Sequence, residues 1–502
     1  MESPTLAFAA LAAYVVLLIA AARRTGRGGG NDDFFRAGRR SPWALVAFGM
    51  IGASVSGVSL VSVPGWVRQT GMTYLQMCAG FMAGYVVIAF ILLPLYYRLR
   101  LTSIYAYLGL RFGPQSRLTG AVFFLLSKLT GASARLYLAC AVLHELATAP
   151  LGIPFAATAA VVLAAIYLYT RKGGVRTLVR TDALQTFCML AATTAVLCAV
   201  ANKMGLTPSE VAHTIGQSQM GKIFEWDAAS PQFFLRQFVS GMFITIVMTG
   251  LDQDMMQKNL TCPRLRDAQK DMCLYGAAFL PVNLLFLALG VLLYTFAARQ
   301  GISLPDEGDR VLPFLVGTGA LGTAVVFPLT VGIAAAALSS ADSAMTAITT
   351  SVCTDLLGVE REDYPAVRAE RTRHIVHIAT AAAFALCVSI FALVGGGTVI
   401  DTIYRMAGYT YGPLLGLFAY GMATRRTVHD RLVPIVAVAA PLLCAALDIA
   451  APYLWGYRFG YELLLLNGAL TAVGLYAIGK DRRKHRQREE DTDSESGFLR
   501  TS

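Results

Sequence analysis

The stretch VGIAAAALSSADSAMTAITTSVCT, residues 331–354, is apolar enough to cross a bilayer but has hydroxyls and a carboxylate at its centre. On a helix, residues spaced at i, i+3, i+4 and i+7 share one face. The residues with this spacing are Ala336, Ser339, Ser340 and Ser343. Asp342 lies close to that face. An ionisable group at bilayer depth costs roughly 2.5–3.5 kcal/mol and usually marks a pathway or a site. Hydroxyls can also tighten helix packing, but the density of SSADS favours a site.

The composition indicates a polytopic membrane protein. Of the 502 residues, 56% are hydrophobic and only 15% are charged, whereas soluble domains have about 25% charged residues. The net charge of +11 could suggest nucleic acid, but the basic residues lie in short loops where membrane topology explains them. We therefore expect no nucleic-acid partner. The nine cysteines are scattered without a CxxC pair, so we predict neither a disulfide framework nor a zinc site.

Thirteen apolar runs are long enough to span a bilayer, which takes about 20 residues each. They cover residues 4–22, 42–67, 72–97, 117–147, 155–171, 179–201, 232–252, 270–298, 322–356, 373–394, 399–422, 432–451 and 460–479. Alternate loops are basic, as the positive-inside rule requires of cytoplasmic loops. The first run is followed, not preceded, by arginines, so we interpret it as a retained helix with its N-terminus outside. The sequence thus predicts an all-α protein of the cell membrane with a cytoplasmic C-terminus.

The thirteen runs divide into two sets of five with peripheral additions. The predicted units are 1–41 (peripheral helix and cytoplasmic loop), 42–201 (first repeat), 202–231 (external loop), 232–422 (second repeat), 423–479 (two peripheral helices) and 480–502 (disordered cytoplasmic tail). Because five is odd, the second repeat enters the membrane from the opposite side, as in the inverted repeats of secondary transporters. The leading helix of each repeat should be interrupted. The first, rich in Gly and Ser with Pro64, favours unwinding; the second is less obviously broken.

Several polar residues within these runs suit ion and anion binding. Unwinding at 52–59 would free backbone carbonyls, and carbonyl, hydroxyl and carboxylate oxygens are the ligands of hard cations such as sodium. Asp182 either stabilises a helix start or is a second cation ligand or proton carrier reaching Asp342 and Ser343. Arg135, well inside its run, either pairs with a buried acid or faces a cavity and recognises an anionic substrate.

The remaining acidic pair does not indicate an enzyme. Asp252 and Asp254 lie beside Lys258 at a predicted cytoplasmic helix end, where a gate or loop anchor is a better interpretation than a catalytic dyad. We find no nucleophile–base or metal-ligand set in the sequence, so we do not expect catalysis.

Five motifs, in order along the chain, resemble the sodium/solute symporter family, which includes sodium–glucose, sodium–proline and sodium–sialic acid transporters. They are DDFFRAGRRSPWALVAFGMIGASVSGVSLVSVPGW, GGVRTLVRTDALQ, GLDQDMMQ, AAALSSADSAM and GYTYGPLLGLF, and together they cover about residues 33–422. The resemblance implies the inverted five-plus-five (LeuT-like) fold with about 13 transmembrane helices. It also implies symport of a small organic solute with one or two sodium ions, by a protein that works as a monomer in the lipid bilayer.

The resemblance also implies two ion sites. The primary sodium site would be formed by backbone carbonyls of Gly52 and Val55 with Ala336, Ser339 and Ser340. The second site of some members would be formed by Asp182, Asp342 and Ser343. Family members often have Ser where this chain has Asp342, so the number of coupled ions stays open.

The substrate class is inferred from positions where this chain differs from the sodium–sugar members and positions where it resembles the sialic acid members. Sodium–sugar members carry a Glu where this chain has Cys78, and their gate Tyr and Asn are replaced by Met248 and Thr245, which disfavours a neutral hexose. The candidate substrate residues, similar in position to those of sialic acid members, are Ser54, Ser56, Ser59 and Arg135, with Tyr74 as an aromatic wall and Phe243 as a further contact. They favour a carboxylate-bearing solute such as a sialic acid. A neutral solute (sugar, proline or a vitamin-like compound) and a transporter-like sensor are the alternatives.

Overall fold

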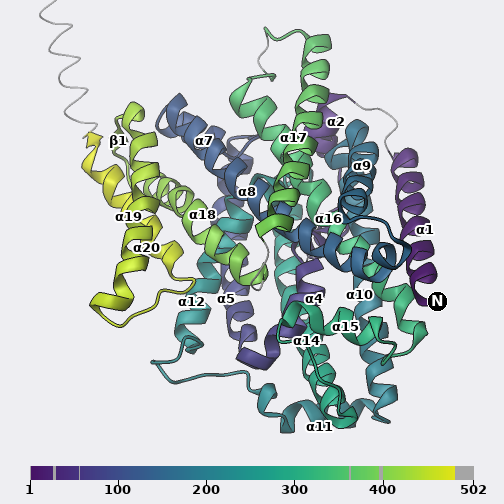
Figure 1. The fold of residues 1–502 in the computed structure, drawn as a ribbon. Helices are drawn as coiled ribbons and strands as arrows, with labels where there is room; N and C mark the ends of the chain where they lie inside the picture. Colours follow the sequence, from purple (N-terminus) through teal and green to yellow (C-terminus); the bar gives the residue numbers. More distant parts are fainter. Residues whose placement is uncertain (1, 26–29, 56, 361–362, 395–398, 481–502) are drawn as a thin grey trace, which may run out of the picture.

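The structure, a computed structural model, describes residues 2–25, 30–55, 57–360, 363–394 and 399–480, and it is built almost entirely of helices (Figure 1). Within these residues the strands are a single short antiparallel pair, β1 (Thr427–Val428) with β2 (Gly479–Lys480). The all-α fold class is therefore confirmed. The predicted tail from 481 onward lies outside the described residues.

The helices follow one another with short connections. In the first half and the loop after it they are α1 (Glu2–Thr25), α2 (Asn31–Arg36), η1 (Ala37–Arg39), α3 (Trp43–Ser54), α4 (Gly57–Thr70), α5 (Tyr74–Val87), η2 (Ile88–Leu92), α6 (Leu93–Arg98), α7 (Ala106–Arg111), α8 (Pro114–Leu143), η3 (His144–Thr148), η4 (Ala149–Leu151), α9 (Phe155–Gly173), α10 (Val175–Lys203), α11 (Pro208–Gln217) and η5 (Gln219–Gly221). The second half contains α12 (Phe234–Thr245), η6 (Ile246–Gly250), α13 (Gln253–Asn259), α14 (Leu265–Gln300), α15 (Gly308–Gly317), η7 (Thr323–Val325), α16 (Val326–Ser351), η8 (Val352–Leu356), α17 (Ala366–Val394) and α18 (Val399–Ala423), followed by η9 (Asp430–Leu432), α19 (Val433–Leu454) and α20 (Leu463–Ala477).

Every predicted apolar run coincides with one of these helices or with a bent pair of them. In the described part of the chain, eight helices are long and apolar enough to cross a membrane, or up to ten if each of two bent pairs is one span. Two further apolar helices are shorter, at 155–171 and 463–477. The count of thirteen crossings therefore stays a prediction.

The leading helix of each predicted repeat is bent, as the repeat requires. The bend between α3 and α4 is 54°, and the bend between α12–η6 and α13 is 68°. The second break was the less obvious one in the sequence. Its local cause is Asp252, whose side chain accepts hydrogen bonds from the backbone N–H groups of Asp254 and Met255, at 2.9 and 3.4 Å, and so starts a new helix.

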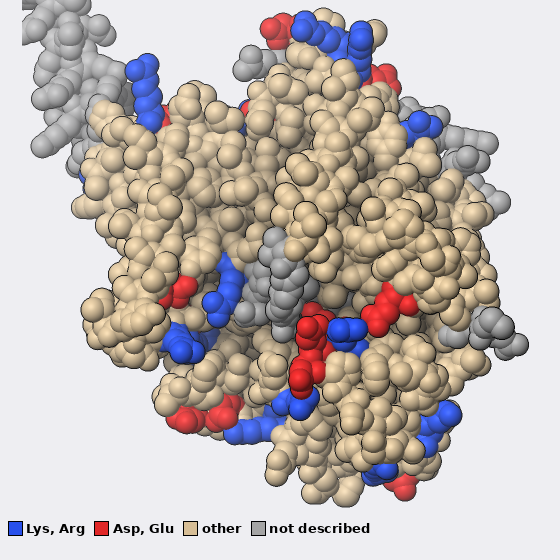
Figure 2. Space-filling view, viewed as in Figure 1, with Lys and Arg blue, Asp and Glu red and all other residues tan. Residues whose placement is uncertain are grey.

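The loops fall at two opposite ends of the molecule. In Figure 1, α2, α7 and β1, which belong to predicted cytoplasmic loops, lie at the upper end, whereas α11 lies at the lower end. In Figure 2, charged side chains lie along the upper rim and over the lower half of the visible face, and the band between them shows almost none. This distribution is the one expected of a protein that crosses a bilayer.

Helix α16, which contains the stretch 331–354, occupies the centre of the fold. Every residue from 332 to 351 is buried. In its most apolar window 78% is buried inside the protein, against 22% for α17. Its neighbours include α3, α8 and α10. The hydroxyls and the carboxylate of this stretch are therefore enclosed by protein and do not face lipid.

Candidate functional site

A cavity of about 90 Å³ lies beside the break in the first repeat. It is lined by the last turn of α3 and by α5, α8, α12, η6, α13, α14 and α18. Both bent pairs contribute to it, since Ser54 is the last residue of α3 and Met255 belongs to α13. The two interrupted helices thus meet at one site.

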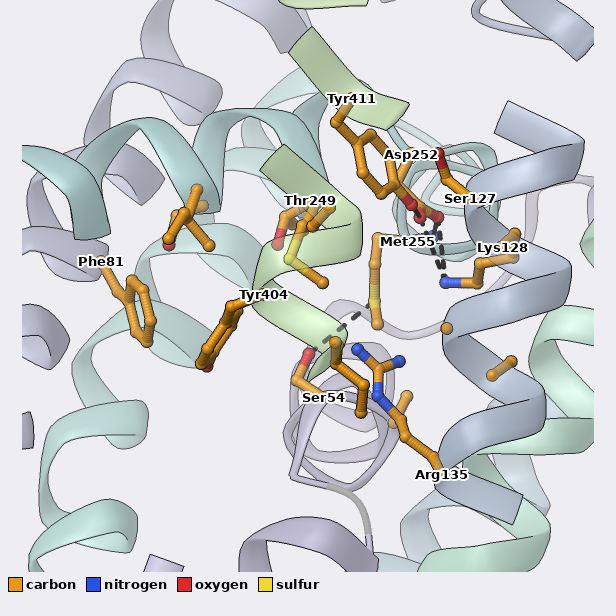
Figure 3. A pocket seen from close by; sticks show the side chains of 18 of the residues that line it. Ser54, Phe81, Ser127, Lys128, Arg135, Thr249, Asp252, Met255, Tyr404 and Tyr411 are labelled. Carbon is orange, nitrogen blue, oxygen red and sulfur yellow. Dashed lines mark hydrogen bonds and ion pairs between the residues drawn. The ribbon is translucent and has the colours of Figure 1, made fainter. Parts of the chain in front are cut away.

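Arg135 on α8 supplies a charge to the cavity wall. Its guanidinium points toward Ser54 and Met255 (Figure 3). Among the described residues, no acidic side chain lies within 4.0 Å of this guanidinium. The pairing with a buried acid that the sequence left open is therefore not seen in that part of the chain. A guanidinium carries five N–H donors in a planar fork that suits a carboxylate.

A second cation, Lys128, lines the cavity but is paired. Its ammonium lies 3.2 Å from a carboxylate oxygen of Asp252 and 2.7 Å from one of Asp254. The hydroxyl of Tyr411 donates to Asp252 at 2.5 Å. Sequence reasoning missed Lys128, although a lysine in the middle of an apolar run is itself a signal of function. Lys128 of α8 thus binds both Asp252 and Asp254 at the cavity wall, which fits the predicted role of this acidic pair as a gate or anchor.

Hydroxyls and aromatic rings complete the wall. Ser54 hydrogen-bonds with the hydroxyl of Tyr275, and its own hydroxyl lies 3.9 Å from the sulfur of Met255. Tyr404 lines the cavity, and its hydroxyl lies 2.9 Å from that of Tyr74. Tyr74 therefore lies behind Tyr404 and supports the wall. Tyr404 was not found from sequence, because one tyrosine in an apolar helix carries no distinctive signal.

The remaining positions from the sequence analysis are divided. Thr245 and Met248, which replace gate residues of the sodium–sugar members, line the cavity. Ser59 and Phe243 are only partly buried and lie outside the residues that line it. Cys78 is fully buried behind the wall. Ser56 falls outside the described residues. Direct contact of Ser59 or Phe243 with a solute stays a prediction.

The residues predicted for the primary sodium site lie where α3, α10 and α16 meet. Helix α3 ends at Ser54, next to the predicted carbonyl ligands Gly52 and Val55, and the last-turn carbonyls of a helix generally lack intrahelical partners. At Gly52 a Cβ atom would lie 2.1 Å from Oγ1 of Thr186, so only glycine permits this approach of α3 to α10.

The hydroxyls on α16 fit a cation at this place. The Oγ atom of Ser340 is buried and has no hydrogen-bond partner in the described protein. The hydroxyl of Ser339 lies 3.3 Å from Oδ1 of Asp182. A buried polar atom without a partner is costly, and oxygen donors beside a helix break suit a hard cation. The assignment to Gly52, Val55, Ala336, Ser339 and Ser340 stays a prediction that this geometry supports.

The residues predicted for a second cation separate into two groups. Asp182 and Ser343 both contact the ammonium of Lys258, at 2.7 and 2.5 Å. Asp342 instead accepts a hydrogen bond of 2.5 Å from the hydroxyl of Tyr169. The amide of Gln185 lies 3.5 Å from the same oxygen of Asp342. Sequence reasoning placed Lys258 beside Asp252 and Asp254 and missed its contacts with α10 and α16.

Comparison with known proteins gives the same fold and family. The structure resembles a Na⁺-coupled sialic acid symporter in a substrate-bound outward-open state, with a TM-score of 0.82 at 18% identity over 95% of this chain and 100% of that one. It also resembles Mhp1, a nucleobase-cation-symport-1 family transporter, with a TM-score of 0.56 at 13% identity over 88% of this chain and 92% of that one. These neighbours confirm the LeuT-like fold.

The matches to known sequences and to a family model identify the family of this chain. The chain is 24% identical to the sodium/sialic acid symporter NanT of Aliivibrio fischeri over 88% of this chain and 87% of that one. It is also 25% identical to the human sodium/iodide cotransporter over 78% of this chain, and this match spans about 60% of the cotransporter's length. The model of the sodium:solute symporter family matches residues 34–429. The chain therefore belongs to the sodium:solute symporter family, in which sodium is the coupling ion and the activity is transport and not catalysis.

Proposed function

We propose that this protein imports a small organic anion together with sodium by alternating access, and that Arg135 binds the anion's carboxylate. The observation that carries the proposal is the cavity-facing guanidinium of Arg135, which has no acid within 4.0 Å in the described chain. Arg135 is only partly buried, and its planar fork of N–H donors faces the cavity, where the carboxylate of an anionic solute would supply the acceptors. The protein would act as a monomer, with its N-terminus outside and its C-terminus in the cytoplasm.

The names of several relatives support an anion. Curated relatives include a sodium/iodide cotransporter, two sodium/sialic acid symporters and a sodium-coupled monocarboxylate transporter, at 22–25% identity. Iodide, sialic acid and monocarboxylates share a negative charge and little else. A positively charged recognition element in the cavity is the feature that such solutes would have in common.

The size of the cavity favours a small solute. Its volume of about 90 Å³ is below the ~300–1,000 Å³ of typical ligand pockets. We therefore place a short carboxylate of a few heavy atoms ahead of a sialic acid, which would require the cavity to widen around Arg135 and Tyr404.

The predicted ion site adjoins the solute cavity through one residue. Ser54 lines the cavity, and Val55, the next residue, would offer its carbonyl to sodium. A sodium ion bound to α3 and α16 would therefore fix the end of α3 and with it the position of Ser54. Each sodium that enters gains about 2.3 kcal/mol per 100 mV of membrane potential, which drives accumulation of the solute if net positive charge moves inward.

A solute screen tests this proposal. Purified protein is heated with short carboxylates, a sialic acid, iodide and neutral sugars, each with sodium and with potassium in its place. We expect sodium-dependent stabilisation by a short carboxylate and none by sugars. Solutes that stabilise are then tested by counterflow in proteoliposomes. Stabilisation by a neutral solute alone would contradict the anion, and binding without counterflow would indicate a sensor.

A further inference from the structure

We propose that the ammonium of Lys258 is a built-in second cation, held where a second sodium ion would bind, so that this protein binds and couples a single sodium. The predicted ligands of that second ion included Asp182 and Ser343, and Lys258 contacts both. The coupling consequence rests on the proposed transport function, whereas the number of sodium ions bound does not.

The contacts of Lys258 are those of a coordinated cation. Its Nζ atom lies 2.7 Å from Oδ2 of Asp182 on α10 and 2.5 Å from Oγ of Ser343 on α16. Oδ1 of Asp254 lies 3.9 Å away. The side chains of Lys258 and Asp182 are 2% and 0% exposed, so water contributes little to the balance of charge. One ammonium thus joins three elements through oxygen atoms alone.

A sodium ion cannot share these oxygens with the ammonium. An ion bonded to Asp182 and Ser343 would lie within about 4 Å of Nζ. At that separation, two unit charges in a medium of effective dielectric about 20 repel enough to lower an affinity about a thousandfold. The second site is therefore closed to sodium for as long as Lys258 keeps its position.

The backbone around Lys258 holds it in that position. All residues of α13 are buried. The side-chain amide of Gln257, the preceding residue, donates to the carbonyl of Phe35 at 2.8 Å and to the hydroxyl of Thr350 at 2.9 Å. These bonds fix α13 to α2 and α16. Unlike a sodium ion, this charge cannot leave the protein during a transport cycle.

A single coupled sodium changes the charge that the protein moves in each transport cycle. If one sodium accompanies one monoanion, no net charge crosses the membrane with the loaded protein. Solute accumulation would then follow the sodium gradient and would not respond to the membrane potential. A transporter with two sodium sites and the same solute would carry one positive charge per cycle and produce a current.

Counting bound sodium tests the proposal without any solute. Equilibrium binding of radioactive sodium to the purified full-length protein should give one ion per chain. Lys258→Met, which keeps the length but removes the charge, should bind two. Lys258→Arg, the matched control, keeps the charge and should bind one. In the double variant Lys258→Met with Asp182→Asn the second ion should be lost again.

Each result decides the question. Two ions bound by the wild type, or one ion still bound by a folded Lys258→Met variant, would overturn the proposal. If Lys258→Met does not fold, the wild-type count and the current of wild-type proteoliposomes remain decisive, since an inward positive current during monoanion uptake would also overturn it. Absence of any carboxylate uptake would sink the proposed function but leave the sodium count standing.

Discussion

Arg135 and Lys258 are two cations in the membrane-embedded core with opposite surroundings. Lys258 has a carboxylate and a hydroxyl within 2.7 Å. Arg135 lines a cavity and has no acid within 4.0 Å in the described chain. Burying a charge is costly unless it is paired. The protein itself compensates this cost at Lys258, whose side chain is 2% exposed, whereas Arg135 is only partly buried and presents its N–H donors to the cavity, where a ligand can accept from them. Lys258 should therefore govern stability and ion count, and Arg135 should govern solute affinity.

Removal of Lys258 should have the largest effect, and it should fall on stability. In sodium-free buffer, Lys258→Met should lower the free energy of unfolding by about 3–5 kcal/mol, because it leaves the buried carboxylate of Asp182 unpaired. Arg135→Met is the control and should cost much less, since it leaves no acid unpaired. Denaturant unfolding of both variants in the same lipid environment measures the difference. Equal losses would remove the distinction between the two cations.

Removal of Arg135 should weaken carboxylate binding by about 2–5 kcal/mol, the range for loss of one partner of a desolvated charge pair. Arg135→Ala is compared with Arg135→Lys, which keeps the charge but loses the planar fork and should bind with intermediate affinity. Titration by thermal stabilisation gives the affinities. Unchanged solute affinity together with lower stability would instead make Arg135 a structural residue.

Ser340→Ala should weaken sodium binding by roughly 1.5–3 kcal/mol, the value of one hydroxyl contact to a charged group. Ser343→Ala, one turn away on α16, is the matched control, because the Ser343 hydroxyl contacts Lys258 at 2.5 Å. Its sodium affinity should stay close to that of the wild type. The sodium dependence of uptake provides both values. A reversed order of the two variants would place sodium at Ser343 and contradict the assignment of both sites.

A cation near the surface should show the smallest loss of stability on removal. Arg236 contacts Glu462 at 2.5 and 3.0 Å, with side chains 18% and 19% exposed. Because solvent reaches this pair, Arg236→Gln should cost no more than about 1 kcal/mol of stability, and added salt should reduce the loss. A cost similar to that of Lys258→Met would mean that burial does not determine what these charges contribute.

Much of the architecture could be predicted from sequence because it rests on local patterns. The helical spacing of Ser339 and Ser340, the Gly- and Ser-rich break before Pro64 and the position of Arg135 within an apolar run are visible in single segments. These patterns predict the all-α fold class, which the structure confirms, whereas the family was inferred from the resemblance of five motifs and is confirmed by the match to its family model. These signals depend on helical periodicity and hydrophobicity, which a single sequence records well.

The pairing of the charges could not be predicted, because it depends on long-range geometry. Lys258 reaches Ser343, 85 residues away, only because the chain turns by 68° before α13. The direction of Asp342 is set by the hydroxyl of Tyr169, 173 residues away. A sequence places both residues on their helices but does not show which neighbour each side chain meets.

Asp254 has a consequence of its own, since one of its oxygens lies 2.7 Å from Lys128 and the other 3.9 Å from Lys258. Lys128 lines the solute cavity, and Lys258 contacts Asp182 beside the predicted ion site. A displacement of α8 relative to α13 would change the distance from Asp254 to Lys128, and with it how strongly this carboxylate stabilises the charge of Lys128. The electric field at the solute cavity and the field at the predicted ion site are thus set partly by the same carboxylate, which couples the two sites electrostatically.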